Sequence, residues 1–273
     1  MNLEMIETLP PWEWPEDAGK TFLNLLKNRQ ADDSQRLLAA ELAGDFTVVN
    51  NELAEALLSV LRSDDEPDEL RAQAAISFGP ALEAADEGTF DGDPEGETIS
   101  DDTFTKIKRV LQGLYMDVDV PQEVRRRILE AAIRSPHDWH RPAISSAYAN
   151  DDAGWKLTAV FCMRFINGFD KQILEALGSE DDEIHIEAVQ AAGNQEVDGA
   201  WAHVVELVRS KDTDKLLLLA AIDAVANIRP EKAGEILDHL TSSDDEEIVE
   251  AASDAMHMAE AELAVERGDD DFF

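Results

Sequence analysis

The chain has 273 residues, of which 60 are acidic and 23 are basic, so its formal net charge at pH 7 is -37. A charge of this size favours solubility and opposes binding to DNA, RNA or anionic lipid, so we expect no nucleic-acid or membrane partner. The single cysteine, Cys162, excludes an intramolecular disulfide. Because there is neither a basic signal sequence at the start nor an apolar run of about 20 residues, we expect a cytoplasmic protein.

Residues 1–14 form a separate N-terminal segment that contains the sequence Pro-Pro-Trp-Glu-Trp. The prolines disfavour a helix interior, and the aromatic rings favour contact with the rest of the protein. We therefore expect Trp12 and Trp14 to cover the first end of a helical array, with a partner-docking peptide as the alternative. A helix should begin at Pro15 and run through Phe22 and Leu26.

A twelve-residue pattern occurs seven times along the chain. Its clearest copy, residues 181–192, has acids in the opening turn, apolar residues at positions four and six, Ala-Val at eight and nine, and Ala at twelve. The eighth position is filled by Ala39, Ala74, Ile128, Ala159, Ala188, Ala221 and Ala251. Most intervals are near thirty residues, with one of 54, and such a period is typical of a solenoid.

Each copy of the pattern predicts an amphipathic helix with small residues on its buried face. A second amphipathic run follows, so we pair each motif helix with the run after it, as in residues 182–209 and 214–240. Neither helix can bury its apolar face alone, so the pairs must stack. The predicted fold is an all-α superhelix of about seven helix pairs in one domain over residues 15–262, in which the last motif helix has no partner.

The 54-residue interval holds an acidic insertion, residues 86–102, with eight acids, three glycines and no base. This composition predicts a solvated loop. Residues 91–96 together with Asp102 partly match a calcium-binding loop, which is the alternative. Thr98 at the eighth position and aspartate in place of glutamate at the twelfth both weaken that match.

Basic residues concentrate directly after the insertion and define what we call the basic strip. Its members are Lys106, Lys108, Arg109, Arg125, Arg126, Arg127, Arg134 and Arg141. They either neutralise nearby acids of the same molecule or form a docking surface for an acidic partner. We select Lys106, Arg109 and Arg126 as candidate partner-binding residues.

Three other clusters have structural interpretations. The turn that contains His137, Asp138 and His140 could ligate a metal, but without a second ligand cluster we expect a rigid turn with Trp139 packed inward. The aromatic residues of 153–177 have helical spacing and are assigned to the core, and Cys162 is expected to be buried and inert. We predict no cofactor and no metal site.

The last segment, residues 263–273, is predicted to be an acidic, disordered tail. It ends in Phe272 and Phe273, and two aromatic residues beside acids can serve as a short linear anchor. We therefore add this pair to the candidate partner-binding residues.

The repeats resemble HEAT repeats, particularly the short HEAT-like type of the phycobilisome-lyase family. Residues 242–252 show the acidic turn followed by an Ala-containing helix, and Arg71 and Arg125 resemble the arginine of the family's first helix. Members include scaffolds, bilin lyases, a diiron hydroxylase and DNA glycosylases. The hydroxylase needs recurring His-Glu pairs, whereas His185 is followed here by Ile186, and the basic surface of the glycosylases conflicts with this net charge.

Taken together, these features predict a monomeric, non-enzymatic scaffold or adaptor that binds a protein partner, with basic proteins among the candidates. We expect binding on the concave surface, formed by the second helices of the pairs. Two alternatives stay open: a bilin or tetrapyrrole lyase or chaperone, which the resemblance implies, and an acidic DNA mimic that binds a basic protein.

Overall fold

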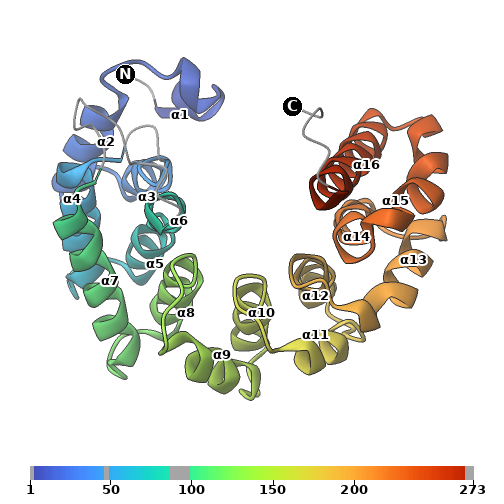
Figure 1. Cartoon of the computed structure of the whole chain (residues 1–273). Coiled ribbons are helices and arrows are strands. Elements are labelled where there is room, and N and C mark those ends of the chain that lie inside the picture. The colour runs from blue at the N-terminus through green and yellow to red at the C-terminus, as the bar shows by residue number, and fades with distance from the viewer. Residues whose placement is uncertain (1–2, 46–48, 87–98, 268–273) are drawn as a thin grey trace. The chain divides into compact units, whose positions relative to one another are not determined.

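The computed structural model describes residues 3–45, 49–86 and 99–267, and every regular element in these ranges is a helix (Figure 1). The predicted all-α class is therefore confirmed. None of the described helices combines the length and apolarity that a membrane span requires. The chain divides into two compact units, Met1–Ala143 and Ile144–Phe273, which we describe one at a time.

The N-terminal unit contains three helical hairpins. Its helices are α1 (Leu3–Glu7), α2 (Ala18–Lys27), α3 (Asp33–Leu42), α4 (Asn51–Arg62), α5 (Asp68–Ile76), α6 (Gly79–Asp86), α7 (Asp101–Met116) and α8 (Gln122–Ala132), with a short 3-10 helix at Pro11–Glu13. Helix α2 packs on α3, α4 on α5, and α7 on α8. The motif helices α3, α5 and α8 form one row, and α2, α4 and α7 form the other (Figure 1).

The C-terminal unit repeats this arrangement. Following α9 (His140–Tyr148), its helices are α10 (Ala153–Cys162), α11 (Asp170–Ala176), α12 (Asp182–Asn194), α13 (Trp201–Arg209), α14 (Lys215–Ile228), α15 (Pro230–Leu237) and α16 (Glu246–Arg267), with 3-10 helices at Asp198–Ala200 and Asp238–Ser242. Helix α11 packs on α12, α13 on α14, and α15 on α16. The motif helices α10, α12, α14 and α16 again stand in one row.

These hairpins shift the predicted pairing by one helix. We expected each motif helix to pair with the run that follows it, but every motif helix except α10 packs more on the helix that precedes it than on the one that follows. The reason is the short turn in front of the motif, which joins the two helices of each hairpin; these turns are residues 28–32, 63–67, 117–121, 177–181 and 210–214. The last motif helix, α16, therefore has a partner, α15, contrary to our expectation.

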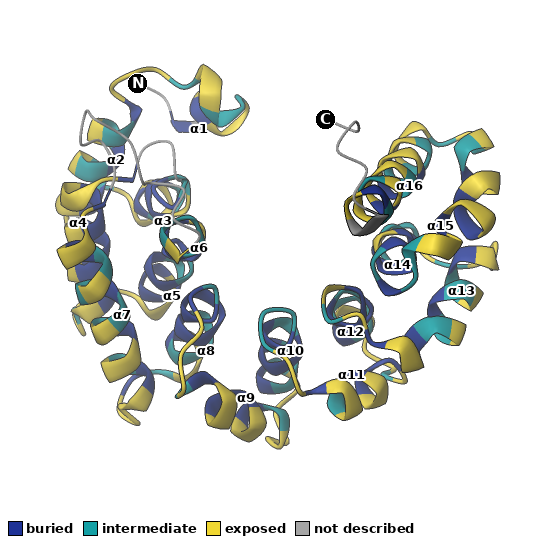
Figure 2. Cartoon of the chain, viewed as in Figure 1, coloured by how far each residue is buried: buried dark blue, intermediate teal, exposed yellow. Residues whose placement is uncertain are grey.

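The motif positions form the core of both units. Every residue at positions eight, nine and twelve is buried except Ala251, which is half-buried (Figure 2). Small residues let the motif helices approach closely: a Cβ on Gly193 of α12 would lie 2.9 Å from the Cα of Ala224 of α14. Because successive motif helices pack more closely than their partners, each unit by itself bends toward its motif row. The concave side of each unit therefore carries the motif helices and not, as predicted, the runs that follow them.

The N-terminal segment agrees only in part with the prediction. Trp14 is half-buried, lies edge-on against Phe22 with ring centroids 5.6 Å apart, and donates its indole N–H to the carbonyl of Leu9 at 3.0 Å. Trp12 is 81% exposed, so it does not pack inward as predicted. The unpredicted helix α1 instead supplies buried apolar residues, of which Ile6 is 1% exposed.

Both ends of the predicted insertion and the start of the predicted tail are helical. Asp101 and Asp102 lie in the first turn of α7, which Ser100 caps, and α6 precedes the insertion. The calcium-loop residues 91–96 and Thr98 lie outside the described residues. Helix α16 continues to Arg267 with Ala264 buried, so the segment from 263 begins as helix, and Phe272 and Phe273 lie outside the described part of the chain.

Candidate functional site

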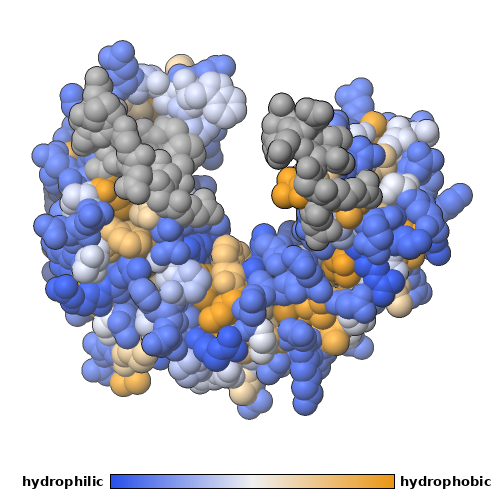
Figure 3. Space-filling view, viewed as in Figure 1, coloured by the Kyte–Doolittle hydropathy of each residue, from blue (hydrophilic) through white to orange (hydrophobic). Residues whose placement is uncertain are grey.

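Hydrophilic residues dominate the visible face of each unit (Figure 3), and four of the eight residues of the basic strip form ion pairs with nearby acids. Lys106 pairs with Glu55 of α4, and Arg126 pairs with Glu123 of its own helix at 2.9 Å. Arg127 contacts Glu123 and Glu130, and Arg134 contacts Glu83 of α6. These contacts match the neutralising interpretation, so Lys106 and Arg126 do not join Arg109 in one site.

Arg109 lines a cavity of about 370 Å³ on the surface of α7. The other lining residues are Thr105, Lys108 and Gln112 of α7 and His137 of the turn before α9. The four α7 residues have the spacing i, i+3, i+4 and i+7, which places them on one helix face. Among the described residues, no acid lines this cavity, although the chain carries 60 acids.

Lys108 is positioned by contacts on two sides. Its ammonium donates a hydrogen bond to the Ser135 hydroxyl at 3.0 Å and lies 4.5 Å from the centroid of the Phe104 ring. Ser135 is 1% exposed and in turn donates to a carboxylate oxygen of Asp86 at 2.7 Å. An ammonium has three donors, and only one is used by Ser135.

The turn that carries His137 is held by buried His140. His140 is 1% exposed, and its Nδ1 accepts a hydrogen bond from the backbone N–H of His137 at 2.8 Å. Its ring packs against Trp139 at a tilt of 36°, with ring centroids 3.8 Å apart. Burial, followed by the charge of His137, lowers the pKa of His140 to about 4, so this ring is neutral at pH 7. Trp139 also packs on Tyr115 with centroids 5.1 Å apart, which agrees with the predicted rigid turn.

Sequence reasoning identified this cavity incompletely. Arg109 was a candidate, Lys108 was only a member of the basic strip, and His137 was considered for a metal site. Thr105 and Gln112 were missed, although their helical spacing from Arg109 was a usable signal. Within the described residues, no group of three or more His, Cys, Asp or Glu side chains could hold a metal ion.

The arginines noted from the resemblance have a structural role. Arg71 donates from Nε to the carbonyl of Leu61 at 3.2 Å, and Arg125 donates from Nε to the carbonyl of Tyr115 at 2.8 Å. Arg36 makes the same contact from Nη2 to the carbonyl of Leu26 at 3.2 Å. Each arginine bonds a carbonyl ten residues earlier, near the end of the preceding helix, whose last carbonyls lack helical partners. The sequence pattern of an apolar residue followed by arginine identified Arg71 and Arg125 but not Arg36, because Gln35 precedes Arg36.

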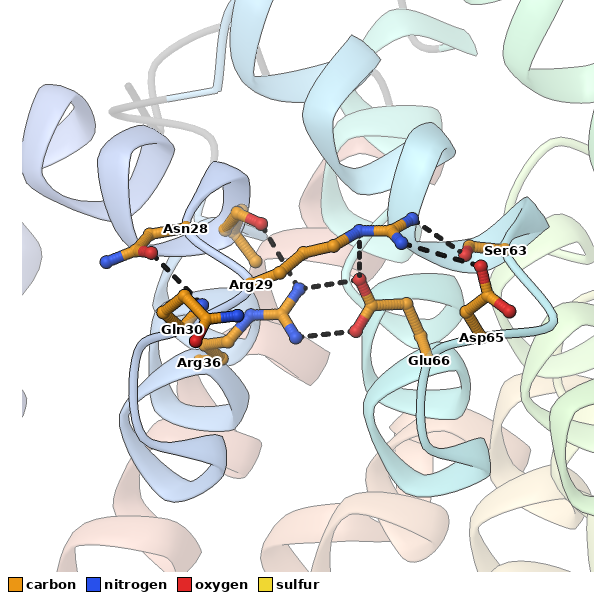
Figure 4. Close-up of polar contacts among 8 residues, drawn as sticks. Asn28, Arg29, Gln30, Arg36, Ser63, Asp65 and Glu66 are labelled. Carbon is orange, nitrogen blue, oxygen red and sulfur yellow. Dashed lines mark hydrogen bonds and ion pairs between the residues drawn. The ribbon is translucent and has the colours of Figure 1, made fainter.

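Arg36 is also the centre of a buried ion-pair cluster (Figure 4). Its two terminal nitrogens lie 2.5 and 2.9 Å from the carboxylate oxygens of Glu66, and Nε of Arg29 lies 3.5 Å from the same carboxylate. Hydrogen bonds from Arg36 hold the pKa of Glu66 below its usual value. The cluster joins the α2–α3 hairpin to the turn before α5.

A second cavity of about 460 Å³ lies beside this cluster, between α2 and α4. Its lining mixes charges, with Lys27 and Arg29 opposite Glu52, Glu55 and Glu66. Because its lining carries charges of both signs, this cavity offers less discrimination between anions and cations than the cavity on α7.

No protein-family model and no curated protein matches this sequence. Among solved structures, human deoxyhypusine hydroxylase in complex with glycerol is similar, with a TM-score of 0.40 and 15% sequence identity, covering 95% of this chain and 96% of the other.

Proposed function

We propose that this chain is a HEAT-like, non-enzymatic protein-binding module that recognises an anionic group of its partner in the cavity on α7. The observation that carries the proposal is a cavity lined by Lys108, Arg109 and His137, without a described acid, in a chain of net charge -37. The two obligate cations suit a carboxylate or a phosphate, the groups that guanidinium binds through paired hydrogen bonds.

Contacts within the chain position Lys108 and His137 of the cavity without a ligand. The Lys108 ammonium is oriented by Ser135 and Phe104, and His137 is placed by the hydrogen bond of its backbone to His140. A preorganised site loses less conformational entropy on binding than a flexible one. Because buried His140 is neutral at pH 7, the positive charge of this region is carried by Lys108 and Arg109, which line the cavity.

At longer range, the net charge of the chain has an electrostatic effect opposite to that of the cations in the cavity. The acidic surface attracts basic proteins and repels anions, but at about 150 mM salt the screening length is only about 8 Å. The cations in the cavity then dominate the interaction of a ligand bound there. We therefore expect an acidic segment of a partner protein to bind locally, even though the molecule as a whole is strongly acidic.

The test uses the full chain, a hexaglutamate peptide and a peptide of equal length that contains phosphoserine, at about 150 mM salt. We expect Arg109→Glu to weaken binding by at least about tenfold, because it replaces a cation in the cavity with an acid. Arg62→Glu is the matched control, since Arg62 is an exposed arginine of α4 outside this cavity. Equal binding by both variants, or no binding of either peptide by the unmodified chain, would contradict the proposal; the two peptides separate carboxylate from phosphate recognition.

A further inference from the structure

Two histidines of the C-terminal unit face each other across neighbouring helices. His185 of α12 and His203 of α13 have their Nε2 atoms 2.8 Å apart and their ring centroids 5.1 Å apart. Both side chains are half-buried, so they are held by their surroundings and still reach solvent. His185 occupies the fifth motif position, where the first three repeats carry Arg36, Arg71 and Arg125.

The distance between the two Nε2 atoms is that of a hydrogen bond between the rings. One Nε2 donates and the other accepts, so at least one of the two rings is neutral, with a lone pair directed at its neighbour. Burial lowers the pKa of His185, with a further contribution from the charge of His203, and burial also lowers the pKa of His203. Both shifts favour the neutral ring, which is the form in which imidazole binds metals.

The spacing of the two nitrogens also suits a shared metal ion. With metal–nitrogen bonds of about 2.0–2.1 Å, two cis ligands lie about 2.9 Å apart at a right angle and about 3.3 Å apart in a tetrahedron. The rings would have to separate from 2.8 Å by only a few tenths of an ångström. Side-chain rotation can supply a movement of this size without shifting either helix.

The local electrostatics favour a cation at this position. Asp182 lies three residues before His185, and Glu206 lies three residues after His203, so each acid is about one helical turn from a ring. The charge of Asp182 acts to raise the pKa of His185, and that of Glu206 acts likewise on His203. Both acids are exposed and lower the energy of a dication without being required as ligands.

We propose that His185 and His203 form a two-ligand site for a divalent transition metal of the Zn²⁺, Ni²⁺ or Cu²⁺ class. The ring that donates the hydrogen bond changes tautomer, with its proton moving from Nε2 to Nδ1, so that both Nε2 lone pairs bind the metal. Because no larger ligand group occurs among the described residues, water occupies the remaining coordination positions. The site links α12 to α13 and leaves open positions that a side chain of another protein can fill. It does not depend on the cavity on α7.

The experiment is a calorimetric titration of the full, metal-free chain with Zn²⁺, Ni²⁺ and Cu²⁺ in the presence of about 5 mM Mg²⁺, which occupies surface carboxylates. We expect one high-affinity ion per chain, and at least about tenfold weaker binding in His185→Gln and in His203→Gln. His257→Gln is the matched control because His257 is exposed on α16 of the same unit. Circular dichroism establishes that each variant is folded.

A second measurement uses ¹⁵N-labelled histidine in the unmodified chain. Metal binding should shift the Nε2 resonances of two histidines, and both shifts should disappear in the double variant His185→Gln/His203→Gln. Undiminished affinity in that double variant would overturn the proposal. So would the absence of binding by all three metals up to about 1 mM, which would leave the pair as a hydrogen bond alone.

Discussion

Two terminal nitrogens of Arg36 meet the two carboxylate oxygens of Glu66, thirty residues further along the chain, and the two residues are only 2% and 8% exposed. Removing one member of such a pair leaves the other charge buried without its partner. We expect Arg36→Met to lower the free energy of unfolding of the N-terminal unit by about 3 kcal/mol. Urea unfolding, followed by hydrogen exchange in α3 and α5, measures this loss.

The control for that prediction is the double variant Arg36→Met/Glu66→Leu, which removes both charges. It should recover part of the stability, because an apolar pair avoids the cost of one uncompensated ion. Since the pKa of Glu66 is held below its unfolded value, this pair stabilises the protein above about pH 4.3 and ceases to do so as the pH falls through the folded pKa. Losses that simply add in the double variant would contradict a direct coupling.

The lowered pKa of His140 should make the stability of the protein depend on pH in a second, higher pH range. The pKa of an unperturbed histidine is 6.5, whereas that of His140 in the folded protein is about 4, so below pH 6.5 the unfolded chain takes up a proton that the folded chain does not. Stability is therefore complete above pH 6.5 and falls progressively toward pH 4. At pH 5 the loss from His140 should be about 2 kcal/mol.

The variant His140→Asn checks this dependence because its amide oxygen can still accept a hydrogen bond from the His137 backbone. Unfolding in urea at pH 7.5 and at pH 5.0, followed by hydrogen exchange in α7 and α8, should differ less for this variant than for the unmodified chain. The same pH difference in both proteins would show that His140 is not the titrating group.

Substitution by alanine should have opposite effects on stability at Gly193 and at Gly234. A Cβ at Gly193 would lie 2.9 Å from the Cα of Ala224, a backbone atom that cannot move aside cheaply, whereas a Cβ at Gly234 meets nothing within 4 Å. Gly193→Ala should destabilise the C-terminal unit by about 1–3 kcal/mol. Gly234→Ala should stabilise it by up to about 1 kcal/mol through helix propensity. Thermal unfolding of both variants provides the comparison, and equal effects would refute the close approach of α12 and α14.

Glu196 occupies a backbone conformation that favours glycine. Its φ is 50°, and it follows α12 in a turn where Val197 donates its N–H to the carbonyl of Ala192 at 2.9 Å. We expect Glu196→Gly to stabilise the protein by about 0.5–1 kcal/mol, because relief of left-handed strain exceeds the added unfolded-state entropy. Gly168, with φ of 87°, provides the opposite test: Gly168→Ala should lower the melting temperature.

The sequence by itself determined the helices and their buried faces. The motif residues, such as Ala188, Val189 and Ala192, repeat within one helix, and helical periodicity is a local property that fixes which side must be buried. The capped starts of α4 and α12 follow from Asn50 and Asp181 for the same local reason. The N-terminal helix α1 was missed because two buried residues within five give too short a pattern to detect.

Only the tertiary structure decided which helices and side chains meet. A motif helix has amphipathic neighbours on both sides in the sequence, so periodicity alone could not show that the five-residue acidic turn makes the preceding helix its partner. Arg36 and Glu66, or His185 and His203, lie far apart in the chain, and charge patterning does not specify distant pairs. Lys106 and Arg109 are three residues apart on α7, yet Lys106 pairs with Glu55 of α4 and Arg109 lines a cavity, a difference that their spacing alone does not indicate. Helix periodicity is encoded locally, whereas these contacts depend on how whole helices pack.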